Sequence, residues 1–294
     1  MVIMIEDLKY LSKTTKKTLR QCLNILSIQE LLVKICNSEY KSIILLNGDF
    51  IFALNNGFIS DEYMDLDICI ITDDVQSRNI LIIFNEIISV EPDNSIFNIV
   101  NTEIIDEKKE AYGKRYELQI VFKIEGVKIP LVININAGDL KQEINEIKEP
   151  KLYSNLYSVD SIYACSIERI LAERFYGIIK KQIVYDSKLF YDINNILSNY
   201  ILDGRKLKES LQTIFKINEY KPEENDFWSL IDLKNNSMVE KRWTCFLNSI
   251  NKEKISLDVV IDRIEKAFWG IWDGLFNDKA FFGSWMPKLN RYID

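Results

Sequence analysis

The spacing of apolar residues changes part-way along this chain of 294 residues, and that change most constrains its fold. Short apolar runs of strand-like composition come first, at residues 41–48 (KSIILLNG), 66–72 (LDICIIT), 95–104, 115–124 and 127–136. From about residue 158 onward, apolar residues recur at helical spacing instead. The pattern predicts an α+β protein with an N-terminal domain over residues 1–150, a mixed sheet flanked by helices. A helical C-terminal domain is expected over residues 151–294, completing a cleft.

Further elements are expected between these strands. Helical spacing predicts helices over residues 6–38 and 75–89, and a short helix beginning near Asp49. Asp73 and Asp74 precede the second of these and are interpreted as N-cap residues rather than metal ligands. Glu125 and Gly126 are expected to form a hairpin turn, and residues 137–153 are interpreted as a connecting segment.

The chain contains no histidine, which excludes several kinds of chemistry at once. Ser-His-Asp and Cys-His catalysis and His-ligated zinc all require that side chain. The five cysteines are far apart, odd in number and mostly flanked by apolar residues, as is typical of reduced thiols in a cytoplasmic protein. Any catalysis must therefore rely on carboxylates, Lys or Arg, Tyr, Ser or Thr, or a bound metal.

Two aspartates stand in the apolar run that contains residues 66–72. Asp65 and Asp67 are separated by one residue, so on a strand both side chains point to the same face. Two adjacent carboxylates repel each other unless a cation lies between them. Mg²⁺ prefers a few carboxylates together with waters and substrate phosphates, so the pair is a candidate Mg²⁺ or Mn²⁺ site.

A glycine turn precedes this candidate site. Gly48 ends the expected strand 41–48 and stands before the short helix that begins near Asp49. A strand, a glycine turn and a helix N-terminus can offer backbone N–H groups to a phosphate. The alternative interpretation of Gly48 is a plain turn glycine.

Several motifs together resemble the AbiEii/AbiGii abortive-infection toxin family, which belongs to the nucleotidyltransferase superfamily with a DNA polymerase β-like fold. The family turn of type Gly-Gly-Thr-Ala-Leu is matched by LLNGDFIFAL, and its Asp-x-Asp strand by DEYMDLDICI. Its Ala-Glu-Lys-Leu helix is similar to Ala172–Phe175, and KLFYDINNIL is similar to its Lys-Asp-Phe-Tyr-Asp segment. The family strand with a third aspartate is similar to LVININAGD, where Asn134 takes the aspartate position.

The resemblance implies a Mg²⁺-dependent nucleotidyltransferase toxin that moves NMP from an NTP to an RNA acceptor, such as a tRNA 3′ end. It implies that Asp65 and Asp67 hold the metal and that Gly48 and Asp49 approach the phosphates. Toxin–antitoxin or phage-defence systems are the expected setting, with a cognate antitoxin as a partner. An amide at position 134 cannot take up a proton at pH 7. A nucleotidyltransferase-fold module that only binds a protein or RNA is therefore the alternative.

By the same resemblance, three residues of the C-terminal half belong to the site. Arg174 is expected to neutralise the triphosphate, Lys188 to contact the nucleotide, and Asp192 to position it or the acceptor. Simpler interpretations stay open, because Arg174 could pair with an acid such as Asp186, and Lys188 is spaced to pair with Asp192.

Charge and hydropathy set the remaining expectations. A net charge of −7 argues against broad, non-specific binding to nucleic acid. Neither a signal peptide nor a membrane-spanning run of about 18 apolar residues is recognised, so a cytoplasmic protein without membrane contact is expected. Aromatic residues near the C-terminus are interpreted mainly as core residues, with a partner surface as the alternative.

Overall fold

The computed structural model divides the chain into two compact units, residues 1–165 and 166–294. The structure describes residues 8, 12–13, 17–56, 66–110, 113–138, 144–154, 157–180, 186–250, 252–277 and 279–293. Within these residues, no helix has both the length and the apolar character that crossing a membrane requires.

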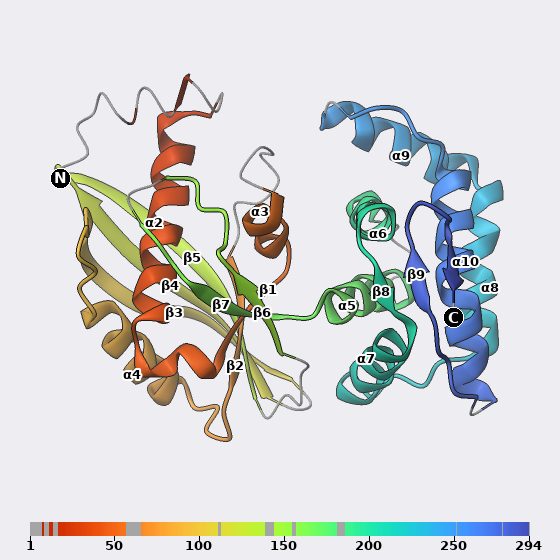
Figure 1. The fold of residues 1–294 in the computed structure, drawn as a ribbon, viewed down its shortest axis with the longest axis horizontal. Helices are drawn as coiled ribbons and strands as arrows, with labels where there is room; N and C mark the ends of the chain where they lie inside the picture. The colour runs from red at the N-terminus through yellow and green to blue at the C-terminus, as the bar shows by residue number, and fades with distance from the viewer. Residues whose placement is uncertain are drawn as a thin grey trace. The chain divides into compact units, whose positions relative to one another are not determined.

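A mixed sheet forms the centre of the first unit (Figure 1). Its seven described strands lie in the order β3-β4-β5-β2-β1-β7-β6. β2 pairs antiparallel with β1 and parallel with β5, whereas β3, β4 and β5 form an antiparallel meander. The strands are β1 (Ile44–Asn47), β2 (Leu66–Ile71), β3 (Asn98–Glu110), β4 (Gly113–Ile124), β5 (Val127–Gly138), β6 (Ile144–Lys148) and β7 (Ser161–Cys165).

Two helices of the first unit, α2 (Leu19–Cys36) and α4 (Ser77–Ser89), contact each other and the sheet. α2 packs on β5 and α4 packs on β3 (Figure 1). α2 begins at a capping box in which the hydroxyl of Thr18 accepts from the N–H of Gln21 while the Gln21 side chain accepts from Thr18 N–H. The short helices η1 (Glu39–Ser42) and α3 (Phe50–Asn56) stand on either side of β1 in the sequence.

The alternation of residues along β4 separates the two faces of the sheet. Tyr116, Leu118, Ile120 and Phe122 are fully buried, and the hydroxyl of Tyr116 donates to the carbonyl of Val75, just before α4. These residues therefore face the helical layer. The residues that alternate with these four along β4 point to the other face of the sheet, as do their register partners on neighbouring strands.

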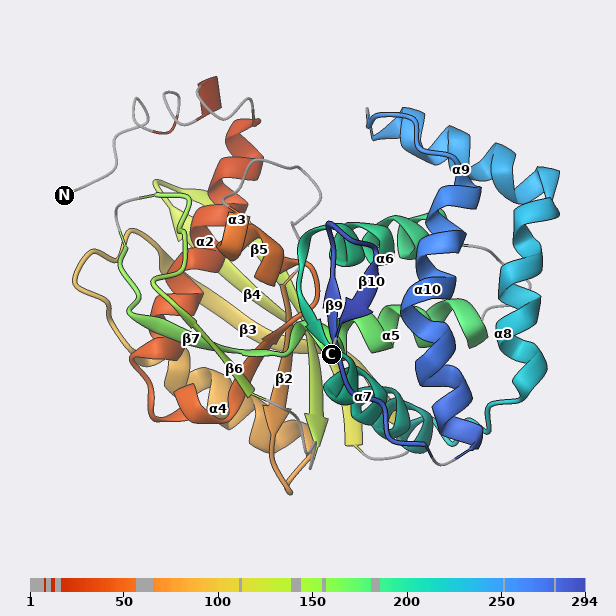
Figure 2. The same ribbon diagram turned by 45° about the vertical axis from the view of Figure 1, so that its right-hand side comes forward.

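The second unit is mainly helical and carries a small three-stranded sheet (Figure 2). α10 runs alongside α8 and also contacts α6 and α7. Its helices are α5 (Ile167–Lys180), α6 (Ser187–Asn199), α7 (Gly204–Ile217), α8 (Glu224–Ile231), η2 (Asp232–Asn235), α9 (Ser237–Ser249) and α10 (Leu257–Phe276). Its strands are β8 (Leu202–Asp203), β9 (Ser284–Met286) and β10 (Arg291–Ile293).

Aromatic side chains fill the core of the second unit. Phe175 stacks on Phe268 with ring centroids 3.8 Å apart, and Phe227 and Trp272 surround this pair. Trp285 on β9 is fully buried and its indole N–H donates to the carbonyl of Leu197, 2.8 Å away. These contacts agree with the core interpretation of most C-terminal aromatics, although Phe282 is exposed.

The expected α+β class is confirmed, and the structure corrects several local predictions. Residues 137–153 are not only a connection, because β6 lies within them. The chain is not helical throughout after residue 158, because β7 joins the main sheet and β8, β9 and β10 form the second sheet. These strands have only two to five residues, which is too short for a periodic pattern to reveal. Asp73 and Asp74 are not N-caps, since Gln76 occupies that position in α4.

Candidate active site

Asp67 is the described member of the predicted aspartate pair. It is the second residue of β2, where it is half-buried between the buried residues Leu66 and Ile68. Asp65 lies outside the described residues.

Asp67 and Asn134 are register partners on the parallel strands β2 and β5. The side-chain amide of Asn134 donates to Oδ1 of Asp67 over 2.8 Å. On the other side of Asp67, Asn47 is its register partner on β1. Asn134 alternates with the buried residues Ile133 and Ile135, so this polar row lies on the sheet face opposite the helical layer.

Gly48 closes the site from the end of β1. Its φ is +69°, in the left-handed region that favours glycine. A Cβ at this position would lie 2.5 Å from Oδ2 of Asp67, well inside van der Waals contact. Glycine thus lets the backbone and the Asp67 carboxylate approach each other more closely than any other residue would allow.

Asp49 follows Gly48 and begins the turn into α3. Its carbonyl accepts from the N–H of Phe52 over 3.0 Å, and its side chain is half-buried. The predicted order of strand, glycine turn and helix is therefore present.

The other three predicted site residues lie in the second unit and form one cluster on α5 and α6. Nε of Arg174 is 3.4 Å from Oδ2 of Asp192, and Nζ of Lys188 is 3.0 Å from the same oxygen. Asp186 accepts from the N–H of Lys188 as the N-cap of α6. The cluster joins two cations to one carboxylate.

Comparison with known proteins bears on the fold. No protein-family model matches the sequence, and no curated protein matches it. Among solved structures, the nucleotidyltransferase toxin MenT4 from Mycobacterium tuberculosis H37Rv matches 90% of this chain and 89% of its own, with 11% identity and a TM-score of 0.57. The chain has a nucleotidyltransferase fold.

Two Helicobacter pylori proteins are also similar to this nucleotidyltransferase fold. A candidate nucleotidyltransferase matches 88% of this chain and 98% of its own, with 12% identity and a TM-score of 0.46. JHP933 matches 87% of this chain and 94% of its own, with 13% identity and a TM-score of 0.44.

Sequence reasoning missed one acidic neighbour of the site in this nucleotidyltransferase fold. Glu117 on β4 is the register partner of Asn134 on β5, so the polar row continues across a fourth strand. Glu117 is half-buried, and it points to the opposite face of the sheet from its neighbours Tyr116 and Leu118. The local motifs around residues 61–70 and 131–139 give no sign of Glu117, because it lies outside them and reaches the site through strand pairing.

The oxygen atoms of this row suit a hard divalent cation. Asp67 offers a carboxylate and Asn134 an amide oxygen, both ligand types that Mg²⁺ accepts, and the backbone of Gly48 lies close to Oδ2 of Asp67. Within the described residues, no three Asp, Glu, Cys or His side chains are grouped closely enough to hold a metal. A cation here would therefore depend on Asp67, on Asp65 and on substrate oxygens.

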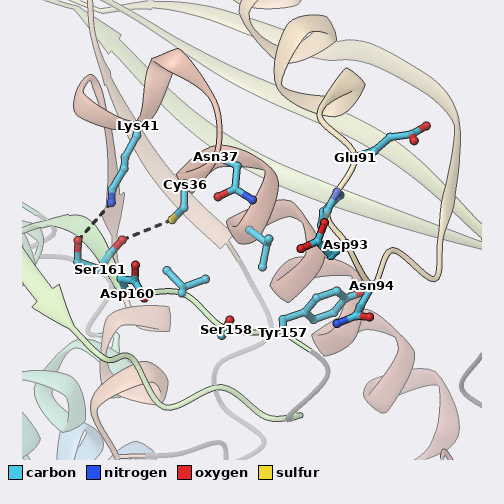
Figure 3. A pocket seen from close by; sticks show the side chains of 13 residues that line it. Cys36, Asn37, Lys41, Glu91, Asp93, Asn94, Tyr157, Ser158, Asp160 and Ser161 are labelled. Carbon is cyan, nitrogen blue, oxygen red and sulfur yellow. Dashed lines mark hydrogen bonds between the residues drawn. The ribbon is translucent and has the colours of Figure 1, made fainter. Parts of the chain in front are cut away.

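A cavity of about 350 Å³ in the first unit does not coincide with this row (Figure 3). Its lining includes Cys36 and Lys41, which precede β1, and Ser161, which begins the parallel strand β7. It therefore lies toward the start of β1, whereas Gly48 follows the end of that strand. The ammonium of Lys41 donates to the hydroxyl of Ser161 over 3.2 Å, and burial raises the pKa of the Cys36 thiol to about 11.

Proposed function

We propose that the chain is a Mg²⁺-dependent nucleotidyltransferase toxin that transfers NMP from an NTP to an RNA acceptor, such as a tRNA 3′ end. The observation that carries the proposal is the meeting of Gly48, Asp67 and Asn134 on neighbouring strands of a nucleotidyltransferase fold. A toxin–antitoxin or phage-defence role, with a cognate antitoxin, belongs to the same proposal.

Each residue of the first unit has a defined task in this proposal. Asp67 and Asp65 hold the divalent ion, which supplies charge neutralisation for the phosphates when bound. Asn134 fixes the orientation of the Asp67 carboxylate through its hydrogen bond to Oδ1. Gly48 allows the backbone to approach the phosphates without a side chain in the way. Asp49 lies in the turn that precedes α3.

The cluster in the second unit supplies the positive charge. Arg174 carries a planar guanidinium that can bind phosphate oxygens in a bidentate manner. Lys188 adds a second cation, and Asp192 holds both in place through its Oδ2. Bound nucleotide would compete with Asp192 for these cations, so Asp192 positions them rather than binding phosphate itself.

Label transfer tests this proposal. The full chain is incubated with Mg²⁺, total tRNA and each labelled NTP, and compared with Asp67→Asn, which keeps the volume of the side chain and removes its charge. Asp73→Asn is the matched control, because Asp73 is exposed and lies beyond the opposite end of β2. We expect transfer by wild type and D73N, and at least a roughly hundredfold loss in D67N.

Two results would contradict the proposal. Equal transfer by D67N and wild type would remove Asp67 from the chemistry. No transfer by folded wild type with any NTP would favour a second candidate, a nucleotidyltransferase-fold module that only binds RNA or protein. The amide of Asn134 at the third carboxylate position favours this candidate, and retention of labelled tRNA without transfer would support it.

A further inference from the structure

The polar row on the open face of the sheet ends in a carboxylate on β4. Asp67, Asn134 and Glu117 are successive register partners on β2, β5 and β4. Neighbouring strands are about 4.8 Å apart, so the backbones of Asp67 and Glu117 are separated by roughly 10 Å with Asn134 between them. All three side chains share one face, since register partners point the same way.

The local contacts of Glu117 distinguish it from the acid on the next strand. Asp106 on β3, the register partner of Glu117, forms an ion pair of 2.8 Å with Lys108. Among the described residues, no ion pair within 4.0 Å and no hydrogen bond engages the Glu117 side chain; Lys108 acts on it only as a nearby charge. Glu117 and Asp106 are both half-buried, so the ion pair of Asp106 is what distinguishes the two acids.

The chemistry of the row lacks one function that Glu117 can supply. The Asn134 amide donates to Asp67 and cannot accept a proton at pH 7, whereas a carboxylate can. Asp67 is assigned to the divalent ion under the proposed function. Glu117 is thus the carboxylate next to Asn134 that is available for proton transfer.

Resting on the proposed function, we propose that Glu117 accepts the proton of the attacking acceptor hydroxyl. The hydroxyl oxygen forms a bond to the α-phosphorus of the NTP as its proton passes to a carboxylate oxygen of Glu117. The bond between the α-phosphorus and the bridging oxygen breaks, and pyrophosphate leaves with the electron pair. Glu117 then returns its proton to solvent. Glu117 on β4 in this way supplies the carboxylate that is missing at Asn134 on the neighbouring strand β5.

Steady-state label transfer by variants of the full chain tests this role. Glu117→Gln should lower kcat by about 10²–10⁴-fold, the usual contribution of general base catalysis, while the KM for NTP changes less than about threefold. Glu117→Asp keeps a proton acceptor and should retain at least about ten times the kcat of E117Q. Asp106→Asn is the matched control on β3 and should transfer label like wild type.

A double variant separates catalysis from structure. E117Q combined with Asn134→Asp returns a carboxylate to the row and should recover at least about tenfold of the kcat lost in E117Q. Thermal unfolding of each variant, with and without Mg²⁺, verifies that the compared proteins are folded. A merely structural role for Glu117 would not be rescued from position 134.

The outcomes separate this inference from the proposed function. Transfer that is lost in D67N but stays within twofold of wild type in E117Q overturns the role of Glu117 and leaves the proposed function standing. Equal losses in E117Q and D106N, or equal kcat in E117D and E117Q, also overturn the role. Absence of transfer by wild type overturns the proposed function, and the role of Glu117 with it.

Discussion

At the scale of single residues, the stability of Asp67 on an apolar strand has a local cause. Asn134 donates a hydrogen bond to Oδ1, so part of the carboxylate charge is stabilised by the protein itself. The sequence suggested that only a cation could make such an acid tolerable. The neutral amide of Asn134 reduces the need for a cation, because a hydrogen-bond donor stands where a second carboxylate would repel Asp67.

Gly48→Ala should destabilise the protein and abolish label transfer. The substitution puts a Cβ at a positive φ and 2.5 Å from Oδ2 of Asp67, so we expect a loss of at least about 2 kcal/mol in the free energy of unfolding. Gly126→Ala is the matched control, because its φ is +85° and its Cβ would meet nothing within 4 Å. Gly126→Ala should lower the free energy of unfolding by only about 1 kcal/mol, the effect of a positive φ alone. Equal losses in urea unfolding would show that the Asp67 contact is unimportant.

The thiols should differ in their rate of alkylation. Burial raises the pKa of Cys36 to about 11, with Lys41 opposing the shift, so roughly one thiol in a thousand is ionised at pH 8. Cys245 is exposed and should react first with iodoacetamide at that pH. Peptide mapping by mass spectrometry after short exposure measures both rates. Alkylation of Cys36 as fast as Cys245 in the folded protein would contradict this expectation.

At the scale of elements, the β4–β5 hairpin sets the geometry of the site. Its two-residue turn, Glu125 and Gly126, has a positive φ at both positions, 46° and 85°. Such turns match the twist of the flanking strands and fix which residues face each other. Counting back from the turn places Glu117 opposite Asn134.

Replacing Glu125 by Asn should stabilise this hairpin. Asn tolerates a positive φ better than Glu, and Asn-Gly is a preferred pair in such turns, so we expect a gain of about 0.5–1 kcal/mol in the free energy of unfolding. Glu125→Ala keeps the backbone strain and should give no gain. Urea unfolding of both variants makes the comparison, and an equal gain in E125A would assign the effect to charge removal instead.

At the scale of the whole molecule, an acidic chain must bind an acidic acceptor through a small number of contacts. The net charge is −7, yet the proposed acceptor is RNA. The 44 Asp and Glu residues outnumber the 37 Lys and Arg residues, so the protein as a whole repels the RNA backbone. Recognition restricted to an RNA end is consistent with this balance.

The affinity for tRNA should accordingly depend only moderately on salt. With about four phosphate contacts or fewer, the slope of log affinity against log salt concentration should be no steeper than about −4. Fluorescence anisotropy with labelled tRNA, measured between about 50 and 200 mM salt, gives this slope. A slope near −8 would reveal an extended basic surface and contradict the expectation.

The sequence by itself determined the elements whose information is local. Alternation along residues 115–124 and 127–136, with the turn at Glu125 and Gly126, predicted the hairpin that β4 and β5 form. Helical spacing predicted α5, α6 and α10 in the same way. Gly48 and Asp67 were recognisable because their residue types are unusual in apolar surroundings.

Only the tertiary structure decided how these elements meet. β2 pairs in parallel with β5, more than 60 residues later, and this pairing alone brings Asp67 to Asn134 and joins Glu117 to the site. The short strands β7 and β8 likewise depend on partners far away in the sequence, because β7 pairs with β1 and β8 pairs with β9. Parallel pairing requires a long crossover whose register no nearby turn fixes, so it depends on the packing of the whole unit.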